Sequence, residues 1–144
     1  MQRFFLSLKE NKMNDRDNGL LALRGEAIGE ILPQSGKEEI FQNQTIRPIL
    51  KLQNDIFIES FLNYVNKSKS DFYSFSIEKK MQFIDNAVHK DIKFRNALKG
   101  MVMAMFTIEE FREYILNSSN LNKRMMNLLI ERLKDQVQLL AQPE

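Results

Sequence analysis

A sharp corner between two helices is the feature that most constrains the fold of this chain. Residues 106–111 read Phe-Thr-Ile-Glu-Glu-Phe. Thr107 is a typical helix N-cap, and Glu110 stands where a capping-box carboxylate reaches back to the Thr107 amide. Phe106 and Phe111 occupy the two positions of a hydrophobic staple, which fixes how the chain enters a helix. The segment therefore predicts a helix, a corner and a second helix.

Amphipathic helical patterns fill most of the remaining chain, and no segment alternates as a strand would. A stripe of apolar residues predicts a helix over 20–32, where Gly25 and Gly29 indicate close packing against a neighbour. The segment 46–66 is apolar on more than one face, as is typical of a central helix. Further helices are predicted to follow N-caps at Ser76, Asp91, Thr107 and Asn120, the last covering 121–140. The prediction is an all-α orthogonal bundle of about six helices with a long C-terminal helix.

Length and composition predict one cytoplasmic helical domain. The chain has 144 residues, of which 43% are hydrophobic and 28% charged, as in ordinary globular proteins. The net charge of +2 is nearly balanced and indicates no particular class of partner. The lack of cysteine excludes disulfides and thiolate metal sites. No apolar run approaches the roughly 18 residues of a membrane span. We expect residues 1–16 to be a flexible or loosely attached extension and residues 17–142 to form the domain.

No pattern in the sequence is typical of an enzyme or a metal site. His89 is the only histidine, and Asp85 lies one helical turn before it. A metal ion needs three or four ligands, so we expect an exposed or salt-bridged His89. Met101, Met103 and Met105 are spaced by two, so in a helix their sulfur atoms cannot converge on one ion and are predicted to fill the core. We expect a non-enzymatic protein without a cofactor or a metal.

The last predicted helix carries a second apolar pattern. Its spacings of four, three, four and three are those of a coiled-coil seam. The sequence therefore predicts a homodimer seam, with one wide stripe buried inside a monomer as the alternative. The seam residues are Met126, Ile130, Leu133, Val137 and Leu140.

Residues 108–134 also fit a helix-turn-helix, whose second helix reads DNA from its N-terminal residues. The side chains of the right type for phosphate and base edges are Asn122, Lys123, Arg124 and Asn127. Against this reading, Glu109, Glu110 and Glu113 make the preceding helix acidic. Nucleic-acid binding is therefore the alternative function.

A polar residue interrupts the inward stripe of the predicted central helix. Gln53 lies between Ile49 and Ile56, with Asn54 beside it. A buried amide without a partner costs about 1–3 kcal/mol. We therefore predict a hydrogen bond from Gln53 to another helix, with a ligand-pocket role as the alternative.

Three stretches carry a resemblance to a known group of proteins. They are 41–54 (FQNQTIRPILKLQN), 91–100 (DIKFRNALKG) and 117–126 (NSSNLNKRMM). Over about residues 20–140 the chain resembles a family of short, uncharacterised bacterial all-helical proteins, some of which are labelled glyoxalase. Glyoxalase modules are built as βαβββ units with His and Glu metal ligands, which this sequence does not provide. The resemblance therefore implies a helical fold and no functional residues.

These observations together favour binding over catalysis. The prediction is a helical protein-protein interaction module that binds a protein partner or a second copy of itself. It is not expected to insert into a membrane.

Overall fold

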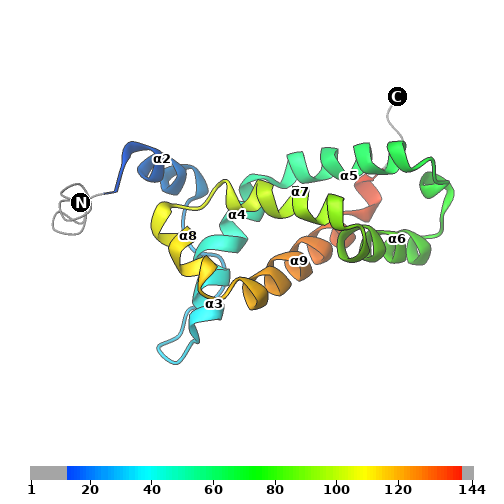
Figure 1. Cartoon of the computed structure of the whole chain (residues 1–144). Helices are drawn as coiled ribbons and strands as arrows, with labels where there is room; N and C mark the ends of the chain where they lie inside the picture. Colours follow the sequence, from blue (N-terminus) through cyan, green and yellow to red (C-terminus); the bar gives the residue numbers. More distant parts are fainter. Residues whose placement is uncertain (1–12, 141–144) are drawn as a thin grey trace.

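The computed structural model describes residues 13–140 (Figure 1). Within this range the chain forms helices and no strand, which confirms the all-α prediction. A π-helical turn (Gln42–Ile46) joins the helix Lys37–Phe41 to the helix Arg47–Leu52, and 3-10 turns cover Phe72–Ser74 and Val137–Leu139. The α-helices are α2 (Asp15–Arg24), α3 (Lys37–Phe41), α4 (Arg47–Leu52), α5 (Asn54–Ser68), α6 (Ile77–Lys90), α7 (Ile92–Met103), α8 (Ile108–Ile115) and α9 (Ser118–Asp135).

The core is built around α9, which packs against α6 and α7. Helix α5 lies beside α7, where the rings of Tyr64 and Phe94 stack with their centroids 4.3 Å apart. Phe61 and Phe72 are fully buried and meet edge to face at 5.4 Å. Helices α2, α3 and α8 lie at one end of the molecule, and the connection from α5 to α6 lies at the other (Figure 1).

The predicted corner before α8 is confirmed in its polar part. The Thr107 hydroxyl accepts from the Glu110 amide at 3.1 Å, and Glu110 Oε1 accepts from the Thr107 amide at 2.8 Å. The staple forms differently, because buried Phe106 packs on Tyr114 with ring centroids 5.5 Å apart, while Phe111 stays 41% exposed. The predicted N-caps Ser76 and Asp91 also accept amide hydrogen bonds.

The last helix begins slightly before the predicted start. Its N-cap is Asn117, three residues before the predicted cap Asn120. Helix α9 ends at Asp135, so the predicted span to residue 140 finishes in a 3-10 turn.

The predicted helix over 20–32 is wrong in its second half. Helix α2 ends at Arg24, and Gly25 and Gly29 then take positive φ angles of 75° and 100°. Such angles are accessible to glycine and strained for other residues. The close packing predicted for Gly25 and Gly29 occurs at Gly29 alone, where a Cβ would lie 2.9 Å from the Asn43 side chain; a Cβ at Gly25 would meet no described atom within 4 Å. The partner of Gly29 is the π-helical turn, where Asn43 also accepts a hydrogen bond from the Ile28 amide.

The predicted central helix over 46–66 is broken at Gln53. The φ and ψ angles of Gln53 are −93° and 9°. The chain therefore leaves α4 at this residue and enters α5 in a new direction. Among the described residues, the half-buried Gln53 amide has no side-chain hydrogen bond, so the predicted contact is wrong. The next residue makes it instead: Asn54 and Gln136 exchange two amide hydrogen bonds of 2.7 Å each.

Candidate functional site

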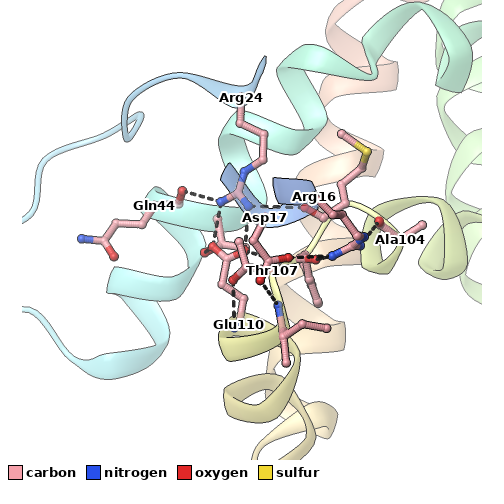
Figure 2. A network of polar contacts seen from close by, with 11 residues as sticks. Arg16, Asp17, Arg24, Gln44, Ala104, Thr107 and Glu110 are labelled. Carbon is pink, nitrogen blue, oxygen red and sulfur yellow. Dashed lines mark hydrogen bonds and ion pairs between the residues drawn. The ribbon is translucent and has the colours of Figure 1, made fainter. Parts of the chain in front are cut away.

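A buried ion pair fixes the end of the molecule where α2 meets α8 (Figure 2). Arg24 Nη1 and Nη2 donate to Glu110 Oε1 and Oε2 at 2.6 and 2.7 Å. Only 2% of the Arg24 side chain is exposed. Two parallel bonds from a guanidinium to a carboxylate fix geometry as well as charge. This pair therefore sets the position of α8 relative to α2.

Backbone and hydroxyl groups complete the cluster around this pair. Arg24 also donates to the carbonyl oxygens of Met105 and Gln44 at 3.3 and 3.2 Å. The Thr45 hydroxyl donates to Glu110 Oε2 at 2.6 Å. Arg24 Nε is the one nitrogen of this guanidinium that has no partner among the described residues. The cluster joins α2, the π-helical turn and the corner before α8.

The pKa of Glu110 lies below its ordinary value of 4.5. Burial acts in the opposite direction and would raise this pKa. Hydrogen bonds from Arg24, Thr45 and the Thr107 amide, together with the charge of Arg24, outweigh that effect. Glu110 is thus an ionised carboxylate whose oxygens already accept hydrogen bonds. A group held in this way stabilises the fold and is poorly suited to accept a proton from a substrate.

A second polar contact anchors the beginning of α2. Arg16 donates to the carbonyl oxygens of Phe106 and Ala104 at 2.9 and 2.8 Å. Asp17 is 4% exposed and accepts from the Ile108 amide at 3.2 Å. The two buried residues of α2 are Asp17 and Arg24, so polar bonds rather than buried leucines hold this helix.

Arg16 is the last residue of the predicted extension, and its bonds place this end of the segment in the folded part. Residues 1–12 of the extension and residues 141–142 of the predicted domain lie outside the described residues.

One face of α8 presents apolar side chains to solvent. Ile108, Phe111 and Ile115 follow one another at spacings of three and four, and Leu116 is the C-cap of the helix. They are 44%, 41%, 55% and 86% exposed, respectively. We call these four residues the α8 patch. Large apolar side chains gathered on one exposed face are typical of an interaction surface.

A groove runs beside the patch, between α3 and α8, and we call it the α3–α8 groove. It consists of two adjoining hollows, which share Ile40, Phe41 and Glu113 as walls. The far hollow, of about 350 Å³, is closed by Leu116 and Leu121 among others. The near hollow, of about 240 Å³, continues past Glu109, Glu110 and Thr107 to Met13 and Leu21 of the α2 region.

Acidic groups border the groove. Glu109 and Glu113 are exposed, and neither forms an ion pair with a described residue. Glu38 lines the far hollow and accepts from Asn117 Nδ2 at 2.9 Å. This hydrogen bond is the main cause that holds the pKa of Glu38 below its ordinary value, with the charge of nearby Arg124 also lowering it. The far end of the groove therefore has a fixed carboxylate, and the near end has two that no described residue pairs.

The predicted dimer seam is wrong as an exposed interface. All five residues are buried within the monomer: Met126 at 1%, Ile130 at 5%, Leu133 at 1%, Val137 at 6% and Leu140 at 1% exposure. Met126, Ile130 and Leu133 belong to the stripe of α9 that packs against the other helices, and Val137 and Leu140 continue it in and after the 3-10 turn that follows. The same spacing that suits a coiled coil also suits a core helix. The buried alternative is therefore the one that the structure supports.

Of the four residues predicted to contact nucleic acid, two are exposed to solvent and two form hydrogen bonds within the protein. Lys123 and Asn127 are exposed. Asn122 accepts from the Tyr114 hydroxyl at 2.6 Å, and Arg124 donates to Gln42 Oε1 at 3.0 Å. Nucleic-acid binding stays a prediction, with two of its four contacts already used within the protein.

The remaining candidates for chemistry lie apart from one another. His89 is exposed, and the neighbouring Asp85 pairs with Lys134 at 2.6 Å instead. Across residues 13–140, no three potential ligands from His, Cys, Asp and Glu come close enough to hold a metal ion. In the same range, no helix is both long and apolar enough to cross a membrane.

Comparisons with known proteins bring no relative to this chain. No protein-family model matches it, and neither a curated protein nor a solved structure gives a significant match. The resemblance to short bacterial helical proteins therefore stays a prediction.

Proposed function

We propose that this protein is a non-enzymatic interaction module that binds another protein through the α8 patch. The observation that carries the proposal is the exposure of Ile108, Phe111, Ile115 and Leu116 on one short helix. Burial of apolar surface is the dominant favourable term in most associations between proteins, and a few well-packed side chains carry most of the binding energy.

The rigid support beneath the patch strengthens the proposal. Helix α8 is tied to α2 by the Arg24–Glu110 pair and by the bond from the Ile108 amide to Asp17. A surface that is already ordered loses little conformational entropy when a partner binds. The apolar face is thus presented in a fixed orientation rather than on a free loop.

Capture of partners from the source cells by tagged protein tests this function. The test variant combines Ile115→Gln with Leu116→Gln, which removes the two most exposed members of the patch. The control combines Ile77→Gln with Ile92→Gln, whose side chains are 55% and 72% exposed on α6 and α7. Both double variants remove a similar amount of exposed apolar surface, so a change in non-specific hydrophobic adsorption affects them alike.

We expect a defined protein to be captured by the wild type and the control and lost with the test variant. Sedimentation of the purified wild type and test variant shows in parallel whether the partner is a second copy. Equal capture by test and control variants, with no change in sedimentation, contradicts the proposal.

A further inference from the structure

The α3–α8 groove combines an apolar floor with an acidic border. Phe41 is buried in the floor, and Leu121 closes the far hollow. Glu109 and Glu113 stand one helical turn apart on α8, beside the near hollow. An occupant that suits this groove carries bulky apolar side chains and basic groups within a short stretch.

The chain itself carries such a stretch immediately before the described residues. Residues 1–12 read MQRFFLSLKENK. The apolar members are Phe4, Phe5, Leu6 and Leu8, and the charged members are Arg3, Lys9, Glu10 and Lys12. Three basic side chains against one acidic side chain match the free carboxylates of the groove.

This stretch is joined to the chain at the mouth of the groove. Met13 lines the near hollow, and the bonds of Arg16 and Asp17 fix the start of α2 next to it. Twelve residues reach at most about 40 Å. The eight residues of α8 rise only about 12 Å. Length therefore does not prevent the stretch from covering both hollows.

The size of the groove favours a tethered occupant over a second copy. A stable interface between two proteins takes about 800 Å² from each partner, with roughly 20–30 residues a side. The lining of the two hollows is far smaller than this. A tethered segment meets its site at an effective concentration of about millimolar, so a small contact is sufficient.

We propose that residues 1–12 of this chain bind in the α3–α8 groove and cover the acidic edge of α8. The apolar side chains of the segment contact the floor at Phe41 and Leu121. Its basic side chains lie against Glu109 and Glu113. Leu116 belongs both to the α8 patch and to the wall of the far hollow, whereas Glu109 and Glu113 lie outside the patch. Removing these two carboxylates leaves the patch intact, so this proposal can fail while the proposed function holds.

Paramagnetic broadening of nuclear magnetic resonance signals in the full chain tests this proposal. The chain has no cysteine, so Gln2→Cys gives one attachment point for a nitroxide at the far end of the segment. We expect loss of signal intensity at Lys37, Leu116 and Leu121 of the far hollow. Signals of the α5–α6 connection, at the opposite end of the molecule, keep their intensity.

Two charge variants identify the cause of any broadening. Glu109→Gln with Glu113→Gln is expected to restore the lost intensity, because it removes the acidic border. Glu59→Gln with Glu131→Gln removes two exposed carboxylates elsewhere and is expected to leave the broadening unchanged. Restoration by both pairs, or by neither, overturns the charge complementarity on which the proposal rests.

A mixing experiment separates the chain's own segment from that of a neighbour. Spin-labelled protein without isotope is mixed with isotope-labelled protein that carries no spin label. Full intensity at the groove in the mixture, with broadening in the singly prepared sample, supports the intramolecular occupant. Any broadening at the groove in the mixture shows the segment of a second copy there, and absence of broadening in both samples shows an empty groove; either result overturns the proposal.

Discussion

Arg24 and Glu110, which are 86 residues apart in the chain, face each other across two hydrogen bonds of 2.6 and 2.7 Å. Through this pair, a helix whose two fully buried residues are both polar is held against the corner of the fold. The pair also fixes the base of α8, whose outer face we propose as the binding surface.

Arg24→Met is expected to destabilise the protein by about 3–5 kcal/mol, because it leaves a partly buried carboxylate without its charged partner. The lower end of this range is expected, since Thr45 and Thr107 still bond to Glu110. Urea unfolding measures the loss, and amide hydrogen exchange should show α2 exchanging faster. Arg112→Met on the exposed side of α8 is the control, with little change expected. Equal stability of the two variants contradicts a structural role for the pair.

The lowered pKa of Glu110 predicts a loss of stability in acid. The unfolded chain titrates near the ordinary value of 4.5, and the folded chain titrates below it. Between these values the unfolded state binds more protons, so the contribution of Glu110 is complete above pH 4.5 and falls as the pH drops through the folded pKa. Urea unfolding at neutral pH and at pH values below 4.5 should show a smaller acid loss for Glu110→Gln than for the wild type. An unchanged acid dependence contradicts the assignment.

The burial of the α9 stripe predicts that Met126→Lys with Ile130→Lys unfolds the monomer. The two side chains are 1% and 5% exposed, and burying an ammonium group without a partner costs several kcal/mol. Far-ultraviolet circular dichroism should show loss of helix at room temperature. A folded variant that differs from the wild type only in sedimentation restores the dimer seam.

The exchange between Asn54 and Gln136 predicts unequal effects at two neighbouring positions. Asn54→Ala removes both bonds between the two amides, while Gln136 Nε2 keeps its bond to the Arg132 carbonyl oxygen at 3.0 Å. We therefore expect a loss at the lower end of about 1–3 kcal/mol. Gln53→Leu is expected to be nearly neutral, because the Gln53 side chain makes no hydrogen bond to a described residue. Thermal unfolding compares the two variants, and a larger loss at Gln53 contradicts the account.

Local signals in the sequence predict local structure well. The Thr107–Glu110 capping box and the caps Ser76 and Asp91 form as predicted, because each needs only neighbours within three residues. The continuity of the helices was harder to predict. A helical stripe continues past Gly25 in the sequence, but the positive φ there depends on how 25–36 meets the π-helical turn.

The cluster around the Arg24–Glu110 ion pair was not predicted from the sequence, also because it depends on contacts between distant segments. Arg24 lies in line with Leu20 and Leu21, and a charged residue within an apolar stripe is the one signal that pointed to it. Its partners Thr45 and Glu110 are distant in sequence, and Glu110 already had a complete local explanation as a capping residue. The predicted dimer seam was wrong for a different reason. A heptad spacing does not reveal whether the facing helix belongs to the same chain or to a second copy.

Site-specific photo-crosslinking in the source cells tests the central claim most directly. A photoreactive residue replaces Ile115 on the α8 patch or Ile77 on α6, two side chains that are each 55% exposed. The account predicts a crosslink to one defined protein, or to a second copy of this chain, from position 115 and none to the same protein from position 77. Identical crosslinking patterns from the two positions, or no crosslink from position 115, contradict a binding function for α8.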